Sequence, residues 1–207
     1  MSTGTPSEEG IITDGVAAVD WAMRVAKIPA DRIVILGQSL GTMVTTAVVE
    51  HYAERGIEFA GVVLVASFTD LPNLLTSYAL GGWVPVLSPL RPYPALQRLF
   101  ISQLNDKWLS VDRLTNFVRV SKKVRLFIIH AKDDHEIPWH HSNAMFAAAA
   151  NATTDGGMTM ELLLKMKARN TVDMGDGAFI STWKAGGNKI IRQEVVPYGR
   201  EYHTVET

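Results

Sequence analysis

The sequence predicts an α/β fold with a mostly parallel sheet and flanking helices. Short aliphatic runs at 33–36, 61–65 and 124–129 are typical of strands buried on both faces. A run at 190–196 alternates enough to make a fourth strand. Because helical patterns separate several of these runs, parallel pairing with right-handed crossovers is expected.

The composition fits one globular unit. The chain has 207 residues, of which 47% are hydrophobic, enough for one sizeable core and too few for two ordinary domains. Lys and Arg number 20 against 21 Asp and Glu, so no net field attracts nucleic acid or an anionic membrane. The absence of cysteine excludes disulfides, thiolate metal sites and a cysteine nucleophile.

The chain begins with a predicted helix, strand and helix. An acidic stretch after Ser7 and apolar residues at helical spacing predict a helix over about 9–27. A short link leads to the strand at 33–36. A second helix is expected from Leu40 to Gly56, since glycine commonly ends a helix.

About fifty residues, 71–121, separate the second and third predicted strands, too many for an ordinary connection. This segment is rich in apolar residues and has prolines at 85, 89, 92 and 94 that prevent one continuous helix. We therefore expect a helical cap inserted at 71–121 into a single domain of residues 1–207. Its apolar cluster either touches a membrane surface or packs in the core, and comprises Trp83, Val84, Val86, Leu87 and Leu90.

The first strand runs directly into Gly37-Gln38-Ser39-Leu40-Gly41, a G-x-S-x-G pattern. A nucleophilic serine must be exposed beside a base and an oxyanion site, and a sharp strand-to-helix turn exposes it. Strand and helix then lie so close that side chains at Gly37 or Gly41 should collide. The Leu40 N–H, at the positive end of the helix, is a candidate oxyanion donor. The alternative is a glycine-rich turn whose serine only caps the helix.

The acid and the base are expected after later strands, in the order serine, acid, histidine. The loop after the strand at 124–129 contains Asp133 and Asp134, and either could orient the base. The alternative is that they only form a turn before the next helix. Six histidines compete for the base, at 51, 130, 135, 140, 141 and 203. His203 follows the last strand, where the base belongs, although it could also be an unstructured tail residue.

No motif indicates a metal or a cofactor, and we expect none. The histidines and aspartates at 130–141 lack H-E-x-x-H spacing, and neither a Walker loop nor G-x-G-x-x-G is present. The first ten residues lack the basic and apolar parts of a signal peptide. The longest apolar stretch, 78–90, is too short and too interrupted to span a bilayer.

Several parts of the sequence carry a family resemblance: residues 4–14, Trp21, and residues 37–42, 68–70 and 129–138. Together they resemble the α/β-hydrolase superfamily and, within it, the branch containing abhydrolase domain-containing protein twelve. That branch contains monoacylglycerol and lysophosphatidylserine lipases. The resemblance implies that Ser39 is the nucleophile, that Asp134, four residues before Pro138, is the acid, and that His203 is the base. It also implies a lipid or ester substrate and endomembrane association.

The resemblance covers only part of that fold. In this superfamily, further strands precede the strand-to-helix turn that carries the serine, and a loop with an H-G motif supplies a second oxyanion donor. Neither has a counterpart here. Family members also place the histidine sooner after the turn than 199–203 does. We therefore expect a partial α/β-hydrolase domain whose first strand exposes an apolar edge and favours association.

The leading interpretation is a serine hydrolase that cleaves carboxylic esters, with monoacylglycerol or lysophospholipid-type lipids as the expected substrates. One alternative is a catalytically impaired remnant that acts as a binding or scaffold protein. Another is a thioesterase or peptidase of the same fold, because one triad supports several acyl chemistries.

Overall fold

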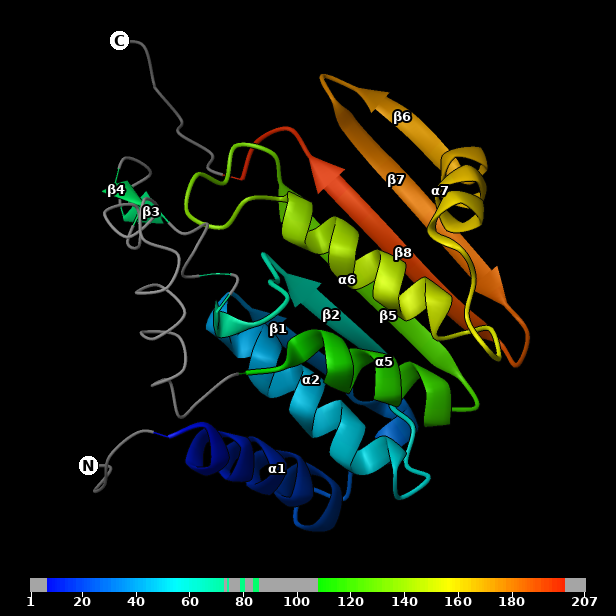
Figure 1. Cartoon of the computed structure of the whole chain (residues 1–207). Coiled ribbons are helices and arrows are strands. Elements are labelled where there is room, and N and C mark those ends of the chain that lie inside the picture. Colours follow the sequence, from blue (N-terminus) through cyan, green and yellow to red (C-terminus); the bar gives the residue numbers. More distant parts are fainter. Residues whose placement is uncertain (1–6, 73, 75–78, 81–83, 86–107, 200–207) are drawn as a thin grey trace, which may run out of the picture.

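The computed structural model describes residues 7–72, 74, 79–80, 84–85 and 108–199. Within them, the main sheet has six strands in the order β1-β2-β5-β8-β7-β6 (Figure 1). Its strands are β1 (Val34–Gln38), β2 (Gly61–Val65), β5 (Val124–Ala131), β6 (Thr171–Gly175), β7 (Ala178–Ala185) and β8 (Lys189–Val196). The first four strands of that order pair in parallel, and β7 and β6 are antiparallel to their neighbours. The predicted α/β class with a mostly parallel sheet is confirmed.

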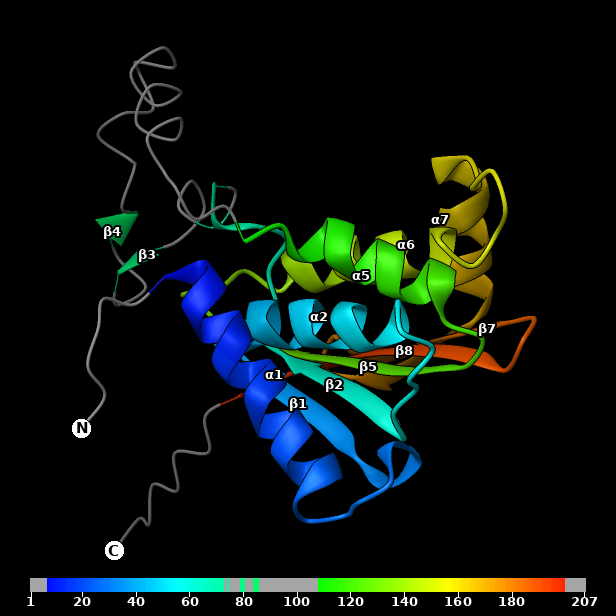
Figure 2. The same cartoon turned by 90° about the horizontal axis from the view of Figure 1, so that it is seen from below.

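One face of the sheet carries a layer of helices. The described helices are α1 (Glu8–Arg24), α2 (Leu40–Ala53), α5 (Ser110–Val120), α6 (His140–Asn151) and α7 (Met160–Arg169), with a short 3-10 turn η1 (Ala30–Arg32). Figure 2 shows α2, α5 and α6 on the same side of the sheet, and α1 packs against α2. Two short strands, β3 (Ala79–Leu80) and β4 (Val84–Pro85), pair with each other and with no other described strand.

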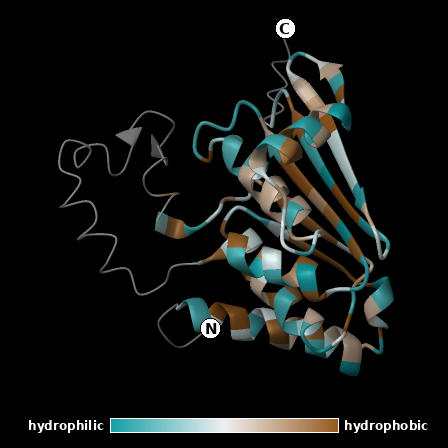
Figure 3. Ribbon diagram, turned by 45° about the vertical axis from the view of Figure 1, so that its right-hand side comes forward, coloured by the Kyte–Doolittle hydropathy of each residue, from teal (hydrophilic) through white to brown (hydrophobic). Residues whose placement is uncertain are grey.

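The main core lies between this helical layer and the sheet. Figure 3 shows hydrophobic residues along the central strands and on the helices above them. The most deeply buried members include Val49, Leu64, Leu114, Val118, Leu126, Ile128, Met145, Phe146 and Ile191. Because β5 alternates between buried and exposed residues, it presents its apolar face to the helices and its other face outward.

The opposite face of the sheet is not covered by any described helix. Val34 and Leu36 of β1 are 55% and 65% exposed, and Phe127 of β5 is 37% exposed. The prediction that the strands at 33–36 and 124–129 are buried on both faces is therefore wrong. The expected exposed apolar edge is present, because β1 pairs only with β2 among the described strands.

Most predicted elements lie close to their observed positions. The first helix begins at Glu8, where the Ser7 hydroxyl accepts from the Gly10 N–H at 3.2 Å. The second helix ends at Ala53, shortly before Gly56 in its positive-φ conformation. The hairpin of β6 and β7 was not predicted as strands. In the turn between them, Gly175, Asp176 and Gly177 all have positive φ.

The helix α5 lies inside the segment that the sequence assigned to the insertion. It packs against α2 and α6 as part of the layer that covers the sheet (Figure 1). Leu114 and Val118 are completely buried in the main core. The residues that remain candidates for a cap therefore precede Ser110, and most of them, 86–107, lie outside the described residues.

Candidate active site

Ser39 occupies a strained turn between β1 and α2. Its φ of 51° and ψ of −124° are unusual for a residue with a side chain, and such backbone costs about 1–3 kcal/mol. Three hydrogen bonds hold it: the Ser39 N–H donates to the Val65 carbonyl at 2.9 Å, and the Thr42 N–H and hydroxyl donate to the Ser39 carbonyl at 2.9 and 2.7 Å. Ser39 is exposed at this turn.

The strand and the helix approach each other most closely at Gly37. A Cβ atom there would lie 2.4 Å from both the Gly41 carbonyl oxygen and the Thr45 hydroxyl oxygen. At Gly41, in contrast, a Cβ atom would meet nothing within 4 Å. The predicted collision is therefore present at Gly37 and absent at Gly41, because it is the Gly41 carbonyl, not its Cα hydrogen, that faces the strand.

The Ser39 side chain does not cap the helix that it precedes. No hydrogen bond joins its hydroxyl to the first turn of α2, and its backbone is outside the extended region usual for a capping residue. The structure thus excludes the capping alternative. Leu40 begins α2, so its N–H has no acceptor within the helix and lies beside Ser39 at the positive end of the dipole.

Asp134 is held in the loop that follows β5. One carboxylate oxygen, Oδ1, accepts from the Ile137 N–H at 2.8 Å and the Glu136 N–H at 3.0 Å. The other, Oδ2, lies 3.5 Å from Nε2 of His130. Burial acts to raise the pKa of Asp134, but the His130 imidazole and the two backbone N–H groups outweigh it and lower that pKa. The group is therefore a carboxylate at neutral pH.

Asp133 has a different partner. Its Oδ1 accepts from the Gly199 N–H at 2.7 Å, which ties the loop after β5 to the chain that leaves β8. That chain leads toward His203, which lies outside the described residues. The two adjacent carboxylates thus have different hydrogen-bond partners. Asp134 accepts from N–H groups of its own loop, whereas Asp133 accepts from Gly199, the last described residue.

Two other histidines lie near the acid loop. His130 is only 1% exposed, and its Nε2 donates to the Ile137 carbonyl at 2.8 Å, so that nitrogen is occupied. His141, at the start of α6, has Nδ1 3.4 Å from the Thr69 hydroxyl in the loop after β2. Burial and neighbouring His130 lower the pKa of His141, while Asp70 opposes them. Sequence reasoning gave His141 and Thr69 no joint role, since 72 residues separate them.

A second hydrophobic cluster joins the loops around the candidate site. It consists of Met43, Phe68, Leu74, Trp108 and Ile137, all buried. Met43 is one helical turn after Ser39, and the Ile137 N–H binds Asp134. The cluster therefore packs the Ser39 helix, the acid loop and the end of the predicted insertion against one another.

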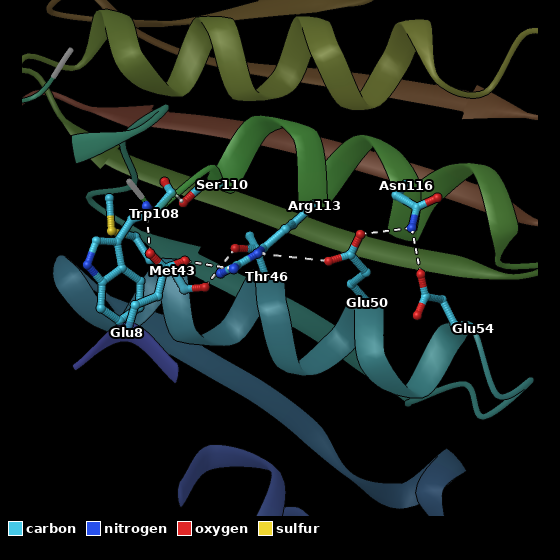
Figure 4. A network of polar contacts seen from close by, with 9 residues as sticks. All are labelled: Glu8, Met43, Thr46, Glu50, Glu54, Trp108, Ser110, Arg113 and Asn116. Carbon is cyan, nitrogen blue, oxygen red and sulfur yellow. Dashed lines mark hydrogen bonds and ion pairs between the residues drawn. The ribbon is translucent and has the colours of Figure 1, made fainter. Parts of the chain in front are cut away.

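Figure 4 shows how Trp108 is anchored at the end of that insertion. The backbone N–H of Trp108 donates to one carboxylate oxygen of Glu8 at 3.1 Å, and Nη2 of Arg113 donates to the other at 2.7 Å. Arg113 Nε also lies 4.0 Å from Glu50. These contacts link α1, α2 and α5, and a hollow of about 350 Å³ opens beside them. Neither Ser39 nor Asp134 lines that hollow.

The part of the chain that the structure describes has neither a metal-binding cluster nor a helix that could span a membrane. It contains no group of three or more histidine, aspartate or glutamate side chains that could hold a metal ion. None of its helices combines the length and the apolar character needed to cross a bilayer.

The fold is that of an α/β hydrolase. A crystal structure of an α/β hydrolase from Vibrio vulnificus superposes with a TM-score of 0.55 at 15% identity, over 71% of this chain and 47% of that one. The profile of the prolyl oligopeptidase family matches residues 7–171, and the chain belongs to that family. The predicted superfamily is confirmed.

Three relatives show how far the similarity extends. Human ABHD12B is 28% identical over 73% of this chain and 39% of its own length. The YfhR protein of Salmonella typhi is 31% identical over 72% of this chain and 46% of its own. Rat lysophosphatidylserine lipase ABHD12 is 28% identical over 72% of this chain and 35% of its own. The chain therefore matches less than half of each of these relatives, which include members of the predicted branch.

Proposed function

We propose that this hydrolase is a serine hydrolase that cleaves carboxylic esters, with Ser39 as its nucleophile. The strained backbone of Ser39 carries the proposal, because a serine needs neither positive φ nor three restraining hydrogen bonds to begin a helix. The close approach at Gly37 and the free helix terminus at Leu40 fit the nucleophile elbow of this class. Gln38 and Gly41 complete its sequence pattern.

In the proposed mechanism, His203 removes the Ser39 proton as the hydroxyl attacks the ester carbonyl. The Leu40 N–H stabilises the oxyanion, and the alcohol leaves after receiving the proton from the imidazolium. Water then hydrolyses the acyl-enzyme by the same route. Asp134 is proposed to orient the imidazole, a role supported by its ionised state. No metal or cofactor has a role in this mechanism.

The proposed substrates are monoacyl lipids, such as a monoacylglycerol or a lysophospholipid. This choice is supported by the similarity to lysophosphatidylserine lipase ABHD12. Peripheral membrane contact through the apolar residues near Trp83 and association with endomembranes are part of the same proposal. The side chains of that cluster lie outside the described residues. Nucleic acid is not an expected partner, given the balanced charge.

A fluorophosphonate probe tests the nucleophile. We expect the purified chain to be labelled and Ser39→Ala to lose labelling. Ser121→Ala is the matched control, because the Ser121 hydroxyl is buried and makes no hydrogen bond with the described residues. Absence of labelling in a folded chain would contradict the enzymatic proposal and favour a binding role.

A substrate panel then separates the acyl chemistries. Lysophosphatidylserine and a monoacylglycerol should be cleaved in preference to an acyl thioester and a peptide anilide of similar acyl chain. Faster cleavage of the peptide would instead favour the peptidase alternative, and faster cleavage of the thioester would favour a thioesterase. All four reactions should disappear in Ser39→Ala.

A further inference from the structure

Lys167 is held in a polar niche between α7, α6 and the sheet. Its ammonium nitrogen Nζ donates to Oδ1 of Asn143 at 2.7 Å and to Oε1 of Gln193 at 2.6 Å. The rings of Phe146 and Phe179 lie 4.9 and 5.5 Å from Nζ. The residue is half-buried, and burial partly desolvates its amine.

The hydrogen bonds around this niche determine which end of the Gln193 amide faces Lys167. The Ser142 hydroxyl donates to the Trp139 carbonyl at 2.7 Å, so it accepts from Nε2 of Gln193 at 2.9 Å. The same Nε2 also donates to Oδ1 of Asn143 at 2.9 Å. The Gln193 amide oxygen must therefore face Lys167. Both acceptors of the lysine are neutral amide oxygens.

No carboxylate neutralises Lys167 among the ion pairs of the described residues. The groups that face it are Asn143 and Phe146 of α6, Phe179 of β7 and Gln193 of β8. The charged neighbours of Gln193 on β8, Arg192 and Glu194, project to the other face of the sheet and pair with each other at 3.2 Å. The aromatic rings attract the ammonium form, but burial prevails and lowers the pKa of Lys167 from 10.5 to about 8.

The geometry also favours the neutral amine as a nucleophile. A lysine nitrogen has three positions besides its carbon, and two of them are taken by the bonds to Asn143 and Gln193. Loss of the third proton leaves both hydrogen bonds intact and places a lone pair at the remaining position. Deprotonation therefore breaks neither of these two hydrogen bonds.

We propose that Lys167 is a modification site that accepts acyl groups from activated thioesters. The Nζ lone pair attacks the thioester carbonyl carbon, a C–N bond forms, and the C–S bond breaks. The sulfur leaves as a thiolate with the bonding electron pair and takes up the proton released by the amine. The product is a neutral amide. The reaction does not involve Ser39, and the proposal is independent of the ester hydrolase activity.

Site-resolved mass spectrometry of the full chain after exposure to S-acetyl-N-acetylcysteamine tests this proposal. The Ser39→Ala background removes any acyl transfer through the proposed nucleophile. Lys165 is the internal reference, because it is exposed on the same helix. At pH 7.5 about a quarter of Lys167 is the amine, against about one in a thousand for an ordinary lysine. Lower basicity offsets part of this advantage, so we expect Lys167 to be acetylated about tenfold faster.

The pH profile and one variant complete the test. The Lys167 rate should rise with pH and level off above about pH 8. Asn143→Asp places a carboxylate beside Nζ and should slow Lys167 acetylation at pH 7.5 several-fold, without changing Lys165. Acetylation of Lys167 no faster than that of Lys165 would overturn the proposal, as would a profile that does not level off. If Asn143→Asp fails to fold, the pH profile of the parent chain alone decides.

Discussion

Alanine substitutions at the two glycines of the Ser39 motif should differ strongly in their effect on stability. In Gly37→Ala, the new methyl group would lie 2.4 Å from the Gly41 carbonyl oxygen and the Thr45 hydroxyl oxygen. Restoring a contact of about 3.4 Å requires β1 and α2 to separate by about 1 Å at this point. Overpacking of a close interface costs about 1–3 kcal/mol, and backbone obstacles cannot rotate away. We expect a loss of about 3 kcal/mol, a large part of the usual stability of a domain.

Gly41→Ala is the matched control. Gly41 lies in α2, and a methyl group there would meet no atom within 4 Å. Its stability should stay the same or rise by up to about 1 kcal/mol. Urea unfolding followed by circular dichroism measures both variants, and fluorophosphonate labelling reports whether Ser39 keeps its conformation. Equal unfolding midpoints for the two variants would refute the reasoning about the close approach at Gly37.

Three further outcomes are expected. Asp134→Ala leaves the Ile137 and Glu136 N–H groups without their acceptor and should lower the unfolding free energy by about 1–3 kcal/mol. Because the pKa of Asp134 is lowered in the folded chain, the parent chain should lose this stabilisation as the pH falls through that pKa. Urea unfolding from pH 7 to pH 3 measures the loss. Arg113→Met leaves Glu8 and Glu50 without their shared cation and should lower the unfolding free energy by about 1–3 kcal/mol, with Lys184→Met, on an exposed side chain, as the neutral comparison. Leu36→Lys, at a side chain that is 65% exposed, should change stability by less than about 0.5 kcal/mol and reduce self-association in sedimentation velocity.

Local patterns predicted the parts of the fold whose signals are local. The aliphatic runs and the Ser39 motif fixed the order of strand, turn and helix, because one short stretch contains all the necessary residues. The exposure of Leu36 and Phe127 was not visible in their own segments, since an aliphatic run looks the same whether one face or both are covered. Burial depends on the helices that pack against the sheet.

Other features depend on contacts between distant residues. The hairpin of β6 and β7 was missed because β6 is short and almost entirely exposed, so no buried apolar run marks it as a strand. The helix α5 fell inside the predicted insertion because its packing against α2 and α6 depends on residues far from it in the sequence. No local sequence pattern marks Lys167. Only the fold brings Asn143 and Gln193 to it.

For the candidate site, the sequence predicted the serine turn and the acid loop but could not distinguish their detailed partners. Asp133 and Asp134 are adjacent and chemically identical, yet one binds Gly199 and the other binds its own loop. His203 stays a prediction as the base, because it lies outside the described residues.

The most direct measurement of the central claim is peptide mapping of the chain after reaction with a fluorophosphonate. The proposed geometry predicts one adduct, on the oxygen of Ser39, and a reaction that weakens as the base is protonated at low pH. A folded chain that acquires no adduct, or acquires it on another serine, would contradict the claim that the turn between β1 and α2 presents a catalytic nucleophile.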